Sequence, residues 1–302
     1  MKPWKAELSL LLITFIWGGT FFFTKEGLDF APPSVYVFIR FSIALILSLA
    51  LFGKNLKHIS KKHIRHGLIL GLIFGGGFLF QTYGLMYTTI SKSAFITGIT
   101  VPVVPFVYWL IEKTRVKFWS KVGVVVASLG LWLFTNPSFE NINIGDLLTL
   151  VSIFFWAFYI TYMDVFTRGT NDFKLTSSLV ILQFVAAAPL ALIAIFLVDL
   201  NGFYFNFGQD LVVSLAYNAI VASLIVTLIH TNVQKYSTPV KAALIFALEP
   251  IVATTVAVVF AGDEIGPRQF VGGSIMIIGV LASETGEMIT KSLRGRLFRQ
   301  SR

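Results

Sequence analysis

Ten apolar segments divide this chain almost from end to end, and each is long enough to cross a lipid bilayer as a helix. A bilayer core about 30 Å thick is spanned by roughly 17 to 25 helical residues. The segments cover approximately residues 8–23, 35–52, 67–87, 93–111, 118–134, 147–166, 175–198, 211–229, 239–261 and 266–285. The connections between them are too short to hold a soluble domain. The sequence therefore predicts an all-α integral membrane protein with ten transmembrane helices.

Composition agrees with this prediction and narrows the possible functions. Hydrophobic residues make up 56% of the chain and charged residues only 13%, whereas soluble domains carry about 25% charged residues. Cysteine is absent, which leaves no thiol nucleophile and no cysteine-based zinc site. The sequence also contains no phosphate-binding glycine loop, HExxH motif or GxSxG motif. We therefore expect no enzyme activity, no cofactor and no metal site.

The Lys and Arg residues are concentrated in every second connection between the spans. A wrong number of helices would not give this alternation, so it tests the ten-helix prediction. With the N-terminus inside, all but four of the 24 Lys and Arg residues fall in inner segments. Lys25, Lys92 and Arg268 are outside, and Arg40 lies within a span. Short cytoplasmic loops are the ones that carry Lys and Arg. We therefore expect both termini in the cytoplasm, and we assign the net charge of +9 to this bias instead of to a nucleic-acid partner.

The chain contains an internal repeat of five spans. An offset of 149 residues aligns Tyr87 with Tyr236, Lys92 with Lys241, Gly123 with Gly272 and Gly130 with Gly279, and an offset of 139 aligns Glu7 with Asp146 and Trp17 with Trp156. The predicted organisation is a first five-helix repeat over residues 1–135, an external linker over 136–143, a second repeat over 144–289 and a basic cytoplasmic tail over 290–302. Because five is odd, the second repeat enters the membrane from the opposite side. Inverted repeats of this kind recur in transporters, where the two copies exchange conformations around a central site.

Several short motifs resemble one family of membrane proteins. They are Trp17-Gly18-Gly19-Thr20-Phe21 followed by Lys25, Arg40 after a proline pair, Gly84-Leu85-Met86-Tyr87-Thr88, and Leu248-Glu249-Pro250. In this order and spacing the chain resembles the EamA-type members of the drug/metabolite transporter superfamily over essentially its whole length. The resemblance implies a ten-helix exporter or exchanger with a cavity between the two repeats. Members of the family handle amino acids, other metabolites or drugs.

Arg40 and Glu249 are the charged residues placed most deeply in the spans, and ionisable residues there are functional candidates. Counted along the helices, Arg40 lies roughly 8 Å below the outer boundary and Glu249 roughly 15 Å above the inner one, so about 7 Å of depth separates them. One hypothesis puts both in the central cavity, with Glu249 as a proton carrier or a counter-charge for a substrate amine and Arg40 as a carboxylate anchor. The alternative is a fixed structural salt bridge between them.

Further candidates surround this pair. Trp17 and Trp156 lie near the middle of their spans, away from the interfaces where Trp usually gathers, so they either form stacking walls for a substrate or pack as ordinary core. Other candidates for the cavity lining are Gln81, Tyr83, Phe95, Tyr159, His230 and Asn232.

Four residues are candidates for gates or hinges. Pro102 and Pro250 each remove a backbone donor within a span, which suits a hinge and equally a static kink. Lys92 and Lys241 begin the fourth and ninth spans on opposite sides of the membrane, which suits gates and equally interfacial anchors.

These observations favour a secondary transporter that exports or exchanges small metabolites, such as amino acids or related amphiphilic compounds, by alternating access. A membrane-embedded enzyme acting on lipid-linked substrates and a facilitative channel remain as alternatives. The expected partners are a small-molecule substrate and the lipid bilayer, and the protein is either a monomer or a homodimer. The expected location is the cytoplasmic (inner) membrane of a bacterium.

Overall fold

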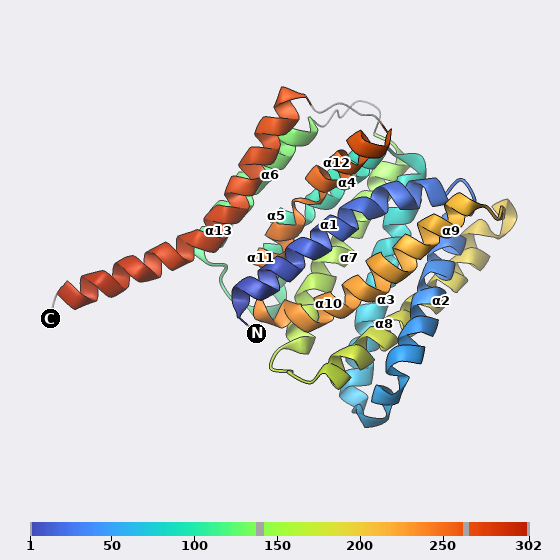
Figure 1. Cartoon of the computed structure of the whole chain (residues 1–302), viewed down its shortest axis with the longest axis horizontal. Helices are drawn as coiled ribbons and strands as arrows, with labels where there is room; N and C mark the ends of the chain where they lie inside the picture. The colour runs from blue at the N-terminus through green and yellow to red at the C-terminus, as the bar shows by residue number, and fades with distance from the viewer. Residues whose placement is uncertain (1, 137–141, 262–265, 301–302) are drawn as a thin grey trace.

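Long helices running back and forth make up the computed structural model of this chain, which describes residues 2–136, 142–261 and 266–300 (Figure 1). No strand occurs in these ranges. The first half contains α1 (Pro3–Gly27), α2 (Pro33–Phe52), the short 3₁₀ helix η1 (Gly53–His58), α3 (Lys61–Tyr87), α4 (Ile90–Gly98), α5 (Thr100–Glu112) and α6 (Phe118–Thr135).

The second half follows a similar order with more irregular turns. It contains α7 (Ile144–Thr167), α8 (Phe173–Ala194), the π-helical η2 (Ile195–Asp199), η3 (Leu200–Gly202), α9 (Gln209–Ala216), the π-helical η4 (Tyr217–Ile225), α10 (Val226–Val233), η5 (Gln234–Tyr236), α11 (Pro239–Phe246), α12 (Glu249–Ala261) and α13 (Pro267–Gln300). The stretch α9–η4–α10 therefore forms one span with a wide turn in its middle.

The predicted fold class is confirmed. Within the described residues, nine stretches are long and apolar enough to cross a membrane, and the tenth expected segment lies in α13. Apolar side chains on the outer surface agree with a lipid environment: Ile46, Phe106, Leu129 and Leu197 are all exposed. Exposed apolar side chains in such numbers are typical of a surface that contacts lipid or another protein.

Ordinary local signals place the helix ends. Pro33 and Pro239 occupy the first turns of α2 and α11, where the missing amide hydrogen costs nothing. Thr89 and Thr238, which are related by the offset of 149 residues, cap α4 and α11 through their side-chain oxygens. Gly169 has a φ of 76° in the turn between α7 and α8, a conformation that favours glycine.

The packing of α6 against α13 displays the symmetry of the repeat. A Cβ at Gly130 would lie 2.8 Å from the carbonyl oxygen of Gly272, and one at Gly123 would lie 2.7 Å from that of Gly279. Gly130 thus contacts the repeat partner of Gly123, and Gly123 contacts the repeat partner of Gly130. A two-fold relation between the halves requires this exchange. Small residues at these positions let the two backbones touch.

The connections alternate between two ends of the bundle (Figure 1). The start of α1 and the α2–α3 and α7–α8 connections lie toward the lower edge of the view, whereas the α1–α2 and α8–α9 connections lie at the upper right. The lower edge corresponds to the side that the distribution of Lys and Arg predicts to be cytoplasmic.

Candidate functional site

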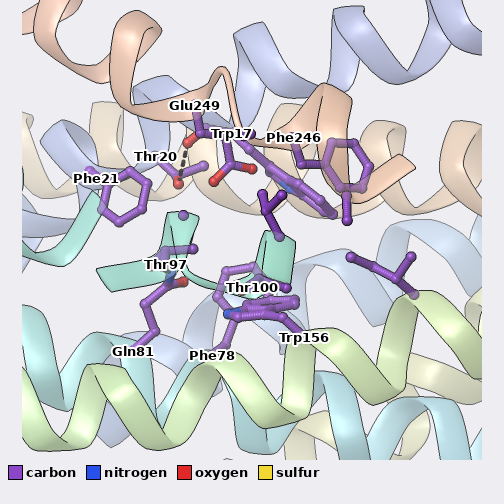
Figure 2. Close-up of a pocket in the computed structure, with 15 residues that line it drawn as sticks. Trp17, Thr20, Phe21, Phe78, Gln81, Thr97, Thr100, Trp156, Phe246 and Glu249 are labelled. Carbon is purple, nitrogen blue, oxygen red and sulfur yellow. Dashed lines mark hydrogen bonds between the residues drawn. The ribbon is translucent and has the colours of Figure 1, made fainter. Parts of the chain in front are cut away.

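A cavity lies in the middle of the bundle, between helices of both halves (Figure 2). The space inside it that the centre of a water-sized sphere can reach is about 40 Å³, room for a few water molecules. Its lining is mainly aromatic and hydroxylic, with one carboxyl group: Trp17, Thr20, Phe21, Phe78, Gln81, Thr97, Gly98, Thr100, Val101, Trp156, Ile160, Ala243, Phe246, Ala247 and Glu249.

Two broken helices deliver residues to this cavity from opposite sides. The fourth span is interrupted between Gly98 and Thr100, and the ninth between Phe246 and Glu249. Thr100 and Glu249 are the first residues of α5 and α12, and the offset of 149 residues relates them. Pro102 and Pro250 fall in the first turns of these second helices, where proline is tolerated. The predicted distortions are therefore interruptions of the helix shortly before each proline.

Glu249 is 8% exposed, and its carboxyl group points into the cavity (Figure 2). In the described part of the chain no ion pair or hydrogen bond involves its carboxylate. Burying an unpaired charge is costly. This position therefore suits a carboxyl group that receives a proton or a positively charged ligand.

The tryptophans related by the repeat meet at the cavity wall. The ring centroids of Trp17 and Trp156 are 6.0 Å apart, Phe246 lies 5.2 Å from Trp17 and Phe78 lies 4.8 Å from Trp156. The two indoles differ in their hydrogen bonds. Trp17 Nε1 donates to the carbonyl oxygen of Ala222 at 3.1 Å, whereas the buried Trp156 Nε1 has no partner in the described structure.

Arg40 is not among the lining residues. It is 1% exposed, its Nε donates to Ser223 Oγ at 2.7 Å, and its guanidinium carbon lies 4.1 Å from the centroid of the Phe78 ring. Phe78 itself lines the cavity, so Arg40 lies behind this ring. Within the described residues no ion pair joins Arg40 to Glu249.

Three other predicted residues lie at or near the cavity. Gln81 lines it, and its Nε2 donates to Thr97 Oγ1 at 2.9 Å. His230, the repeat partner of Gln81, is buried with its ring centroid 5.7 Å from that of Trp17. Tyr159 lies behind Trp156 and donates its hydroxyl hydrogen to Gln183 Oε1 at 2.7 Å.

The remaining predicted lining residues lie elsewhere. The Tyr83 hydroxyl donates to Asp199 Oδ2 at 2.8 Å, and the same oxygen accepts from the backbone amide of Ser34 at 3.0 Å and from its hydroxyl. Asn232 Oδ1 accepts from Thr176 Oγ1 at 2.7 Å. Phe95 lines a separate outer pocket together with Lys92.

Ion pairs between the two halves lie toward opposite ends of the bundle. Lys92 Nζ lies 3.3 Å from Asp146 Oδ2, and Lys241 Nζ lies 3.5 Å from Glu7 Oε1. The lysines are related by 149 residues and the acids by 139, so each pair is the repeat image of the other. Each pair joins the start of a broken span to the first span of the other half.

Sequence reasoning did not select several residues of the cavity. Thr20 and Phe21 stand within a motif already recognised, and Thr100 lies at the offset of 149 residues from Glu249. The repeat therefore contained a signal for Thr100. Phe78, Thr97 and Phe246 carry no pattern that distinguishes them from other span residues.

Comparison with known proteins gives a consistent result. The model of the EamA-like transporter family matches residues 4–136 and again 143–284. The chain is 27% identical over 282 residues to an uncharacterized transporter of Archaeoglobus fulgidus, covering 93% of this chain and 86% of the relative. It is 24% identical to the uncharacterized transporter YcxC of Bacillus subtilis, covering 92% of each.

A solved crystal structure of another protein shares the fold. It superimposes with a TM-score of 0.74 at 13% sequence identity, covering 92% of this chain and 97% of the other. At that identity the likeness concerns the fold alone.

Proposed function

This chain belongs to the EamA-like transporter family, and from that premise we propose that it is a secondary transporter that works by alternating access. Its substrates are small metabolites, amino acids or related amphiphilic compounds, which it exports or exchanges. We place it in the inner membrane of a bacterium, as a monomer or homodimer with both termini cytoplasmic. The two repeats, residues 1–135 and 144–289, then exchange conformations around the central cavity.

The observation that carries the proposal is the pair of repeat-related ion pairs. Lys92–Asp146 lies toward the predicted outer end and Lys241–Glu7 toward the inner end. Opening the cavity to one side separates the helices that one pair joins, while the other pair stays formed. A two-fold relation between the pairs gives the two states comparable energy, as a carrier with two accessible orientations requires.

Side-specific labelling tests this mechanism, because the chain contains no cysteine. A single cysteine in the cavity, Thr97→Cys, is labelled by a membrane-impermeant thiol reagent from either face of the membrane. Partly exposed ion pairs contribute up to about 1 kcal/mol, which corresponds to about a fivefold change in population. We therefore expect Lys92→Gln to raise labelling from outside and lower it from inside by two- to fivefold. Lys241→Gln has the opposite effect.

Two controls complete this test. Lys54→Gln removes an exposed cation outside both pairs and leaves both labelling rates unchanged. Exchanging the charges of the inner pair, Lys241→Glu with Glu7→Lys, restores the original ratio. Equal effects of Lys92→Gln and Lys241→Gln in the same direction would contradict alternating access.

Transport itself is measured with purified protein in liposomes. Counterflow of labelled amino acids and amphiphilic amines, with and without a pH gradient, distinguishes a carrier from a channel, because only a carrier accumulates labelled substrate against unlabelled substrate inside. Absence of counterflow for every compound that binds would exclude the carrier.

A further inference from the structure

We infer that the central cavity selects organic cations that carry an aromatic ring and an amine but no carboxylate. The inference rests on the proposed function and names the substrate class of the same site. It follows from the charge of the cavity, from the position of Arg40 and from the geometry of the aromatic wall.

The charge of the cavity lining comes from one residue. Glu249 is the one ionisable side chain among the described lining residues. On the described helices that pack against α12, the charged groups are Lys5, Glu7, Lys25 and Glu26 on α1, Lys92 on α4 and Arg268 on α13. None of them lines the cavity. A buried carboxylate in these surroundings favours a positively charged ligand.

Most of these neighbouring groups have partners of their own. Glu7 and Lys92 are in the two ion pairs. Lys25 Nζ donates to the carbonyl oxygens of Leu85 and Thr88 at 2.7 and 3.1 Å. Glu26 is exposed. Glu249 is therefore the side chain that sets the charge preference of the cavity.

No cationic side chain stands among the described residues that line the cavity. Arg40 lies behind the Phe78 ring and uses its Nε for Ser223. An amino acid that placed its ammonium group on Glu249 would hold its own carboxylate close to a like charge, with no cation in the lining to offset it. A zwitterion is thus disfavoured relative to the matching amine.

A second acceptor favours an ammonium group near Glu249. The Thr97 hydroxyl donates to the carbonyl oxygen of Ser93 at 2.8 Å, so it accepts the hydrogen bond from Gln81 Nε2. This arrangement fixes the orientation of the Gln81 amide and leaves its carbonyl oxygen without a donor in the described structure. The Gln81 oxygen and the Glu249 carboxylate are both acceptors, which suits a group that only donates.

The aromatic wall suits a ring beside this charge. The ring centroids of Trp17 and Trp156 are 6.0 Å apart. Two aromatic rings in contact are themselves about 4.5–7 Å apart between centroids, so a third ring does not fit between these two indoles. A ligand ring therefore enters a wider form of this cavity and lies against one of the two indoles or against Phe246. Aromatic faces also attract an adjacent ammonium group.

Three probes with one phenyl ring and different charge test the inference. They are phenethylamine, a cation; phenylalanine, the same skeleton with an added carboxylate; and 3-phenylpropionate, an anion. Binding to the purified full-length protein is measured by isothermal titration calorimetry at pH 7, with empty micelles subtracted. We expect phenethylamine to bind at least tenfold more tightly than phenylalanine, and 3-phenylpropionate not to bind.

Variants assign the preference to Glu249. Glu249→Gln weakens phenethylamine binding at least tenfold, whereas Glu249→Asp, which keeps the charge, retains the order of the three probes. Glu26→Gln, the removal of an exposed carboxylate on α1, changes nothing. Equal affinity for phenethylamine and phenylalanine, or an unchanged affinity for phenethylamine in a folded Glu249→Gln protein, would overturn the inference.

The outcome is separable from that of the proposed function, because binding in micelles involves no sidedness. If the protein shows no preference for the cation but Lys92→Gln and Lys241→Gln shift labelling in opposite directions, the inferred substrate class is contradicted and alternating access is supported. The reverse combination would remove the mechanism and leave the binding preference.

Discussion

The two broken spans share a backbone design and differ in their chemistry. In both, a threonine caps the first helix, a lysine follows three residues later, the helix stops after about two turns, and a second helix begins with a proline in its first turn. At the first position of the second helix, however, one half has Thr100 and the other has Glu249. The paired position on the neighbouring span holds Gln81 in one half and His230 in the other.

This comparison separates two requirements on the molecule. The backbone features that would let either end open occur in both halves, as an exchange of conformations between repeats needs. The charged group in the cavity belongs to the second half alone. Equivalent substitutions should therefore have equal effects where the backbone is involved and unequal effects where the cavity lining is involved.

The largest expected effect concerns the seam between α6 and α13. Gly130→Leu and Gly272→Leu each force a side chain against the opposite backbone, at a cost of about 3 kcal/mol. Both variants should lose most of their monodisperse protein on size exclusion in detergent. Gly53→Ala, where only Leu49 comes within 4.0 Å, should behave as the parent does. Loss of monodisperse protein in only one of the two leucine variants would contradict the expectation that both halves contribute equally to this seam.

The next effect compares Glu249→Gln with Thr100→Val. Loss of a charged hydrogen bond to substrate costs about 1.5–3 kcal/mol, so counterflow of the best substrate should fall at least tenfold in Glu249→Gln. Thr100 Oγ1 is buried without a partner among the described residues, so Thr100→Val should change transport by about twofold or less. Initial rates in liposomes measure both, and equal losses would mean that the two halves share the binding role.

The smallest effect compares the two tryptophans. Trp17→Phe removes the hydrogen bond to the Ala222 carbonyl and should cost about 1 kcal/mol, or about 2 °C in the midpoint of thermal unfolding. Trp156→Phe removes an N–H group for which the described part of the chain supplies no partner, so its midpoint should stay closer to that of the parent. A larger drop for Trp156→Phe would show that its indole has a partner in solution.

The fold was predictable because it depends on properties that read directly from the chain. Apolar runs of sufficient length leave few alternatives to helices in a bilayer. The offsets between repeats aligned Gly123 and Gly130 with their partners but predicted no contact, and the structure brings these glycines together across the seam between α6 and α13. The pattern did not predict the π-helical turn at residues 217–225, because tertiary packing decides such turns.

The candidate site was predictable only in part. Trp17, Gln81, Trp156 and Glu249 line the cavity. Depth along a helix selected Trp17, Trp156 and Glu249, whereas Gln81 was selected as a polar residue within a span. Depth does not determine which way a side chain faces. Arg40 was therefore expected beside Glu249, although it lies behind Phe78. The functional roles of all these residues stay predictions.

Asp199 has a consequence for how the predicted outer end of the protein can move. Its Oδ2 receives hydrogens from Ser34 on α2 and Tyr83 on α3, while Asp199 itself ends the η2 segment that continues α8. Separating these three helix ends would strand a buried carboxylate without its donors, which is costly. We therefore expect the ends of α2, α3 and α8 on this side to move as one block. A movement that widens this end then has to separate helices outside the block, such as α4 and α7, which the Lys92–Asp146 ion pair joins.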